Sequence, residues 1–138
     1  KYPRNVATVQ RTCSCYSVPK LWQTGSRVSL VPYEGYRLPR EERMRGYKDV
    51  ELKQLDFKMS ALPSHVVPVA IELVPGSENL CDFEHPEHAL YVFGPEDGSL
   101  SRGMRSACHR FVQIPSRHCF NLSTAAAIVL YDRYNKLR

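Results

Sequence analysis

An acidic, glycine-flanked turn directly follows a short apolar segment of this chain. Residues Ala89–Phe93 are an apolar run, and Gly94-Pro95-Glu96-Asp97-Gly98 comes immediately after it. The run predicts a buried strand, and the residues after it predict a turn. Open α/β sheets build ligand crevices where strands end in such loops, because glycine lets the backbone approach a ligand closely. Glu96 would then place a carboxylate beside the ligand, although an ordinary strand and its exposed turn have the same pattern.

A second segment, His109–Tyr134, repeats this arrangement nearer the C-terminus. Phe111–Ile114 predicts a short strand, a Pro-containing loop follows, and a long apolar helix begins after Asn121. Asparagine is a residue type that caps helix N-termini. Two loops of this kind after two strands favour a binding site over two unrelated turns.

The basic stretch at residues 37–48 indicates binding to an anionic partner, and it contributes to the formal net charge of +5. Phosphate groups bind such clusters of cations, and Tyr36 and Tyr47 could stack on bases. A solvated, loosely ordered loop is the equally weighted alternative. The cations of this stretch are Arg37, Arg40, Arg43, Arg45 and Lys48.

The N-terminal elements must position these groups. Asn5–Tyr16 predicts a helix with Asn5 as its N-cap, and the apolar stripe through Val6, Val9, Cys13 and Tyr16 leaves Arg11 off the core face. Val28–Leu30 predicts a strand. Leu52, Leu55 and Met59 favour an amphipathic helix over Glu51–Leu62.

The C-terminal elements alternate between strand and helix, which predicts an α/β fold with a parallel sheet. Val66–Val74 is continuous in apolar residues, as a strand covered on both faces should be, and Pro75-Gly76-Ser77 ends it. The later predicted elements are a strand at Ala89–Phe93, a helical turn at Leu100–Met104, a strand at Phe111–Ile114 and a helix at Leu122–Leu137.

Size and composition predict one domain over residues 1–138 with a core of its own. The start at Lys1 lacks a strand before the first helix, so we expect an N-terminal segment to be missing. The sequence has no apolar run of about 20 residues and no signal-peptide pattern, which favours a cytoplasmic protein that does not enter membranes. Five irregularly spaced cysteines indicate reduced, mostly buried thiols rather than disulfides or a metal site.

Three segments, in order, resemble the motifs of the SpoU/TrmH family of RNA ribose 2′-O-methyltransferases, in the SPOUT class. Asn5 and Arg11 match the first motif. The second departs by placing Gly98 one position early, and the third has Cys119 where the family has serine. A thiol is the weaker hydrogen-bonding group. The matching residues of the second and third motifs are Phe93, Gly94, Glu96, Leu100, Ile114, Pro115, Asn121, Leu122, Ser123, Leu130, Tyr131 and Asp132.

The resemblance implies a parallel α/β fold with a deep trefoil knot in its C-terminal half. It also implies that S-adenosyl-L-methionine binds to the loops Glu72–Gly76, Phe93–Gly98 and Gln113–Asn121, mostly through backbone groups. The cofactor-binding residues transferred by position are Glu72, Leu73, Gly76, Phe93, Gly94, Pro95, Gly98, Ile114, Cys119 and Asn121.

The implied activity is methyl transfer to a ribose 2′-hydroxyl of tRNA or rRNA by a homodimer without a metal. The implied catalytic residues are Arg11, Asn5, Asn121 and Glu96. Arg11 would also contact RNA, together with the basic stretch. Two alternatives stay open: a non-catalytic relative that binds RNA or the cofactor, and an enzyme that methylates another hydroxyl group.

Overall fold

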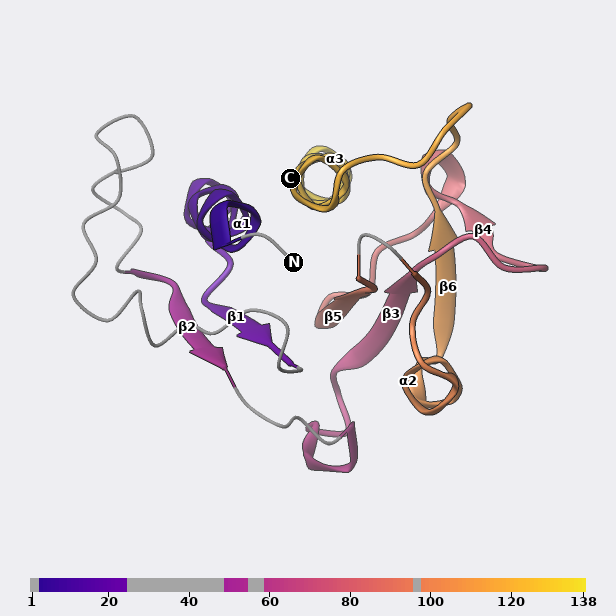
Figure 1. Cartoon of the computed structure of the whole chain (residues 1–138), viewed down its shortest axis with the longest axis horizontal. Helices are drawn as coiled ribbons and strands as arrows, with labels where there is room; N and C mark the ends of the chain where they lie inside the picture. The colour runs from indigo at the N-terminus through magenta and orange to yellow at the C-terminus, as the bar shows by residue number, and fades with distance from the viewer. Residues whose placement is uncertain (1–2, 25–48, 55–58, 96–97) are drawn as a thin grey trace. The chain divides into compact units, whose positions relative to one another are not determined.

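The computed structural model describes residues 3–24, 49–54, 59–95 and 98–138 (Figure 1). Contacts group the chain into two compact units, an N-terminal unit, Lys1–Phe57, and a C-terminal unit, Lys58–Arg138. The predicted strand at Val28–Leu30 lies outside the described residues. Among the described residues, no helix has the length and apolar character needed to cross a membrane.

The N-terminal unit begins with helix α1 (Pro3–Cys15). The predicted cap at Asn5 is wrong: the helix begins at Pro3, whose fixed φ suits the first helical position, and Asn5 is buried within the first turn. Ser17, at φ 57°, ends the helix in a left-handed conformation, and the Val18 N–H donates to the Cys13 carbonyl at 2.8 Å. This arrangement is a Schellman motif, in which serine occupies the position that glycine usually takes.

Two short parallel strands complete the described part of this unit. β1 (Lys20–Gln23) pairs with β2 (Glu51–Gln54), and Lys20 lies opposite Glu51. The helix predicted over residues 51–62 is therefore wrong where the structure describes it. Met59–Ala61 is only a short 3-10 helix, η4. Pairing with β1, a strand that the sequence pattern did not predict, decides the conformation of β2 against its helical periodicity.

The C-terminal unit contains a four-stranded sheet in the order β4-β6-β3-β5, in which every pair is parallel. The prediction of an α/β fold with a parallel sheet is confirmed. The chain passes from β5 across β3 to β6, so β3 lies between its two long neighbours (Figure 1). The strands are β3 (Val67–Ile71), β4 (Glu78–Asn79), β5 (Ala89–Phe93) and β6 (Arg110–Gln113).

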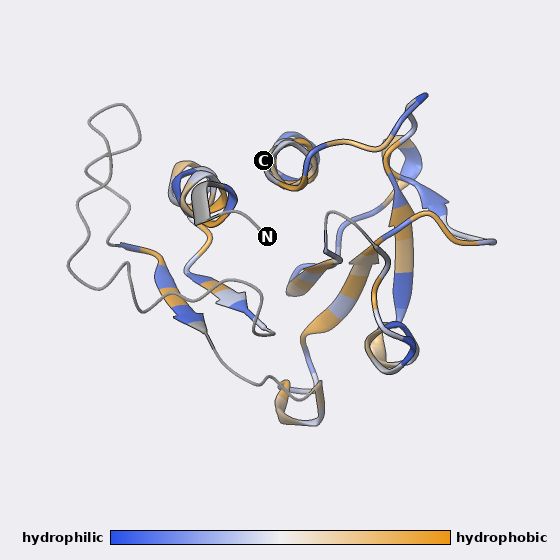
Figure 2. Cartoon of the chain, in the orientation of Figure 1, coloured by the Kyte–Doolittle hydropathy of each residue, from blue (hydrophilic) through white to orange (hydrophobic). Residues whose placement is uncertain are grey.

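Two helical segments connect strands of this sheet, and a third follows the last strand. They are η5 (Leu80–Asp82), α2 (Arg102–Ala107) and α3 (Leu122–Leu137). The predicted bounds of β5 and α3 are confirmed, and β3 and β6 lie within or one residue from their predicted ranges. The predicted turn of helix at residues 100–104 forms slightly later, as α2. β4 has only two residues, both hydrophilic, so no apolar pattern predicts it (Figure 2).

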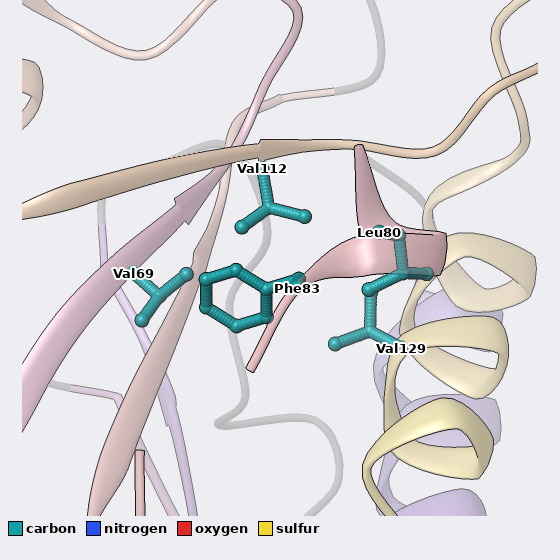
Figure 3. Packing of buried hydrophobic residues seen from close by; sticks show 5 residues of the cluster. All are labelled: Val69, Leu80, Phe83, Val112 and Val129. Carbon is teal, nitrogen blue, oxygen red and sulfur yellow. The ribbon is translucent and has the colours of Figure 1, made fainter. Parts of the chain in front are cut away.

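The core has one cluster on each face of β3, because successive side chains of a strand point to opposite faces. Val69 faces a cluster that includes Phe83 and is covered by α3 through Val129 (Figure 3). Ala70 faces the other cluster, with Leu100 and Cys108. Burying a side chain the size of valine or phenylalanine stabilises the fold by about 1.5–3 kcal/mol. These contacts hold the strand ends in place. The first cluster consists of Val69, Leu80, Phe83, Val112 and Val129.

Candidate functional site

The loops that follow the parallel strands β3, β5 and β6 all begin at the same end of the sheet. Ile71 lies opposite Phe93 on one side and Val112 on the other. The chain therefore leaves β3 at Glu72 beside the exits of β5 and β6, and the Glu72 N–H still donates to the Val112 carbonyl at 3.0 Å. The carboxyl ends of parallel strands are where α/β proteins bind ligands. The predicted loops at residues 72–76, 93–98 and 113–121 thus begin next to one another.

Glu72 joins two of these loops. Its Oε1 accepts a hydrogen bond from the Leu100 N–H at 3.1 Å. Its other oxygen, Oε2, is buried and accepts no hydrogen bond from the described residues. A buried polar atom without a partner is uncommon in folded proteins and needs an explanation.

Glycine is required at position 94 because the backbone of Ser99 and Leu100 lies close to it. A Cβ atom at this position would lie 3.1 Å from the Leu100 backbone nitrogen and 3.4 Å from the Ser99 carbonyl carbon. The backbone after β5 therefore folds back onto Gly94, and the same Leu100 N–H reaches Glu72. Sequence reasoning assigned this glycine to close approach by a ligand, whereas the structure shows close approach by the chain itself.

The loop after β3 turns tightly at Gly76. Gly76 has φ +83°, and the Ser77 N–H donates to the Val74 carbonyl at 3.0 Å, as in a type II turn with Pro75 at its second position. The Gln113 Nε2 donates to the Ser77 carbonyl at 3.5 Å and links this turn to the end of β6. Leu73 points outward and is 74% exposed, so it presents an apolar side chain beside the strand ends.

The loop after β6 leads into α3. Asn121 is confirmed as the helix N-cap: its Oδ1 accepts from the Ser123 N–H at 2.9 Å and from the Thr124 N–H at 3.4 Å. Ser116 Oγ donates to the His118 carbonyl at 2.7 Å within this loop. Cys119 is exposed. The capping oxygen of Asn121 is thus committed to the helix, and the loop before it is exposed from residue 115 onward.

Two of the predicted site residues that the structure describes, Asn5 and Arg11, lie in the N-terminal unit. Arg11 is exposed on α1, as its place off the apolar stripe predicted, whereas Asn5 is buried. The remaining predicted residues, Glu96 and the basic stretch of Arg37, Arg40, Arg43, Arg45 and Lys48, lie outside the described part of the chain.

The expectation that the thiols are mostly buried is wrong for three of the five cysteines: only Cys13 and Cys108 are buried, whereas Cys15, Cys81 and Cys119 are exposed. All five are free. Burial raises the pKa of the Cys13 thiol to about 11. It also raises the pKa of the Cys108 thiol, and the Glu72 charge adds to that effect. In the described ranges, no group of three His, Cys, Asp or Glu residues is arranged to hold a metal ion.

Sequence reasoning missed a buried polar network between β5 and α3. His85 Nδ1 lies 2.6 Å from the Tyr91 hydroxyl, and its Nε2 lies 2.7 Å from Asp132 Oδ2. Arg133 Nη1 donates to the Tyr91 hydroxyl at 3.1 Å, and Lys136 Nζ lies 2.8 Å from Asp132 Oδ2. Asp132 belongs to the third motif, but no spacing rule links it to His85, 47 residues earlier. The network attaches α3 to the sheet.

Comparison with known proteins identifies a family for most of the chain. The family model described as the SpoU rRNA Methylase family matches residues 1–131. A search of curated proteins finds no match.

Solved structures share the fold at low sequence identity. A TrmH/SpoU tRNA modifying enzyme from A. aeolicus has a TM-score of 0.76 and 20% identity, over 99% of this chain and 70% of that one. The SpoU methyltransferase AviRb from Streptomyces viridochromogenes, in complex with the cofactor AdoMet, has a TM-score of 0.76 and 19% identity, over 99% of this chain and 57% of that one. A protein described in a study of 2-OH methylation of C/U34 on tRNA has a TM-score of 0.71 and 19% identity, over 99% of this chain and 90% of that one. This chain thus spans little more than half of some relatives and nearly all of another.

Proposed function

This chain belongs to the SpoU rRNA methylase family, and we propose that it transfers a methyl group from S-adenosyl-L-methionine to a ribose 2′-hydroxyl of tRNA or rRNA. The observation that carries this proposal is the meeting of three loops at the carboxyl ends of β3, β5 and β6. Each of these loops is one that the family resemblance assigns to the cofactor. AdoMet in the complex with AviRb, a protein of the same fold, supports this choice of cofactor.

The three loops would hold the cofactor mainly through backbone groups, in a C-terminal trefoil knot. Two glycines support this: the turn at Gly76 has open space around it, and the absence of a side chain at Gly94 lets the Leu100 backbone lie close to the end of β5. Leu73 adds an exposed apolar side chain. We assign to the cofactor site Glu72, Leu73, Gly76, Phe93, Gly94, Pro95, Gly98, Ile114, Cys119 and Asn121.

When bound, S-adenosylmethionine would supply its methyl group to the ribose 2′-oxygen: the carbon–sulfur bond would break, S-adenosylhomocysteine would leave, and the hydroxyl proton would pass to solvent or to a substrate phosphate. Holding the two reactants in line supplies much of the acceleration. Arg11 is a poor base because the pKa of arginine exceeds about 12. Its guanidinium, exposed on α1, instead stabilises the developing alkoxide. Asn5, Glu96 and Asn121 complete the proposed catalytic set.

RNA is the proposed macromolecular partner, and a second copy of the chain is the other. The basic stretch at residues 37–48 would contact phosphates. On α3, Tyr131 is 59% exposed and Leu137 is 50% exposed, and this outward apolar surface favours a homodimer. Residues 1–138 would act as one methyltransferase domain, in the cytoplasm and without a metal.

Transfer of labelled methyl groups from S-adenosylmethionine to bulk tRNA and rRNA tests the activity directly. Arg11→Ala should abolish transfer while leaving cofactor affinity within about twofold, because the guanidinium acts at the 2′-hydroxyl. Arg102→Ala, at another exposed arginine, is the matched control and should transfer normally. Transfer by Arg11→Ala at the normal rate with saturating RNA would refute the role of Arg11.

Cys119 favours one alternative, a relative that binds the cofactor or RNA without catalysis, because a thiol stands where the family has serine. The same assay separates the two functions. Binding of S-adenosylmethionine without transfer to any RNA supports the alternative, and Cys119→Ser should then restore or raise transfer.

RNA affinity should depend on the basic stretch rather than on Arg11. Neutralising Arg40, Arg43 and Arg45 removes phosphate contacts. The slope of log affinity against log salt is negative, and each lost contact should make it shallower by about 0.7–0.9. Filter binding across a salt series measures this slope. An unchanged slope would place RNA elsewhere on the protein.

A further inference from the structure

Only one of the two carboxylate oxygens of Glu72 accepts a hydrogen bond from the described residues. Oε1 accepts the Leu100 N–H at 3.1 Å, whereas Oε2 is buried and receives no hydrogen bond from the described residues. The same residues provide no ion pair for Glu72. A buried carboxylate oxygen without a donor destabilises the folded protein. A protein that keeps such a group at the ends of its central strands has a use for it.

The surroundings of Glu72 make this atom suited to a ligand. Glu72 follows β3, the strand between β5 and β6, and its neighbours Leu100 and Cys108 belong to an apolar cluster. Burial raises the pKa of the Cys108 thiol, and the charge of Glu72 adds to this effect, so Glu72 interacts electrostatically with a residue of this cluster. Hydrogen bonds to charged acceptors in such surroundings are strong.

The Oε1 bond explains how the carboxylate is held in place. Leu100 is anchored by burial, and the next residue, Ser101, caps α2 by accepting the Met104 N–H at 3.2 Å. The Glu72 side chain is therefore fixed between the end of β3 and the start of α2, 28 residues away in sequence. A side chain fixed in this way presents Oε2 in one orientation.

We propose that Glu72 is a specificity-determining residue of the cofactor site: Oε1 holds the Leu100 backbone beside Gly94, and Oε2 accepts a hydrogen bond from a hydroxyl or amino group of the cofactor. This inference rests on the proposed function. The donor is one that S-adenosylmethionine shares with its product S-adenosylhomocysteine. Binding then completes the hydrogen bonding of a buried group that the protein alone leaves incomplete.

Glu72→Gln tests the proposal, because an amide keeps one oxygen for the Leu100 N–H and replaces Oε2 with a donor. Calorimetry with the full chain should show at least tenfold weaker binding of both S-adenosylmethionine and S-adenosylhomocysteine. The melting temperature of the ligand-free variant should stay within about 2 °C of the wild type, because the bond to the loop is retained. Glu87→Gln, at a side chain that is 91% exposed, is the control and should bind both ligands normally.

The ligand offers a second test that does not depend on how the variant folds. Wild-type protein is titrated with 5′-methylthioadenosine, which lacks the amino-acid part, and with its 2′-deoxy and 3′-deoxy forms. Loss of one donor should cost wild type at least tenfold relative to the parent ligand and cost Glu72→Gln nothing. If no deoxy form loses affinity and Glu72→Gln binds methylthioadenosine normally, the donor is the amino group of the amino-acid part.

Three results would overturn the proposal. Wild-type affinity in Glu72→Gln would show that Oε2 does not meet the ligand. Weaker binding together with a melting temperature lowered by more than 5 °C would mark Glu72 as a loop support only. A wild-type protein that binds no S-adenosylmethionine would refute the proposed function itself, which is distinguishable because that result needs no variant.

Discussion

His85 and Glu72 are two buried or half-buried ionisable residues of the same unit, and the protein treats them differently. Both ring nitrogens of His85 have partners, the Tyr91 hydroxyl and Asp132. Glu72 has one oxygen bonded to Leu100 and one buried oxygen without a described partner. His85 is buried and Glu72 is half-buried, with its Oε2 atom buried.

The directions of the hydrogen bonds around His85 form a closed set. Asp132 can only accept, so Nε2 carries the proton, and Nδ1 must then accept from the Tyr91 hydroxyl. The Tyr91 oxygen remains free to accept from Arg133, as observed. Neutral His85 thus satisfies every partner, and burial, the largest influence, lowers the pKa of this histidine.

The difference between the two residues indicates different purposes. A buried polar network with every partner in place determines how α3 packs and contributes to stability. The Glu72 carboxylate, with one buried oxygen unused, remains available to a ligand. Substitutions in the first network should therefore change stability, and those around the second should change binding.

Removing the centre of the network should have the largest effect on folding. His85→Ala leaves a cavity beside Phe83 and deprives both Tyr91 and Asp132 of a partner, so the free energy of unfolding should fall by about 3 kcal/mol. Urea unfolding measures it. His88→Ala removes a largely exposed ring and should cost less than about 0.5 kcal/mol. Equal losses in the two variants would contradict the importance of the network.

Gly94→Val should be next, because it acts on the loop that Glu72 holds. The new Cβ would lie 3.1 Å from the Leu100 nitrogen, so this backbone must move. We expect a loss of about 2 kcal/mol and loss of measurable S-adenosylmethionine binding with the fold retained. Gly103→Val has open space around its Cβ and is a control for binding. Unchanged cofactor affinity in Gly94→Val would show that this loop is not part of the site.

Tyr91→Phe removes only the hydroxyl that His85 and Arg133 share. Nδ1 of His85 then loses its donor, while the aromatic ring stays in the core. The free energy of unfolding should therefore fall by about 1–2 kcal/mol, as urea unfolding would measure. Cofactor affinity should stay within twofold. A large loss of affinity without a loss of stability would reverse the roles that we assign to the two residues.

The smallest expected effect is a pH dependence of stability. Folded His85 has a pKa below its ordinary value of 6.5, so between the two values the unfolded state binds the proton and the folded state does not. Stability should be fully present above about pH 7 and fall as the pH drops below 6.5, by at most about 1.4 kcal/mol per unit, until His85 is itself protonated. Tyr91, Asp132, Arg133 and Lys136 are the groups that face it. The slope should persist in His88→Ala and disappear in His85→Leu.

Local pattern in the sequence was sufficient for the elements with strong apolar runs. The bounds of β5 and α3 and the cap at Asn121 follow from neighbouring residues alone, because strand burial, helix periodicity and capping act over a few positions. The three motifs and their order likewise lie in the sequence, and they were sufficient to identify the family.

Only the tertiary structure decided which distant residues meet. β2 is a strand because β1 lies beside it, although Leu52 shares a helical spacing with Leu55 and Met59 in the sequence. The Leu100 N–H reaches Glu72 across 28 residues, and Asp132 reaches His85 across 47. The energy of such contacts depends on the path of the whole chain rather than on the residues next to either partner, and no periodicity in the sequence records it.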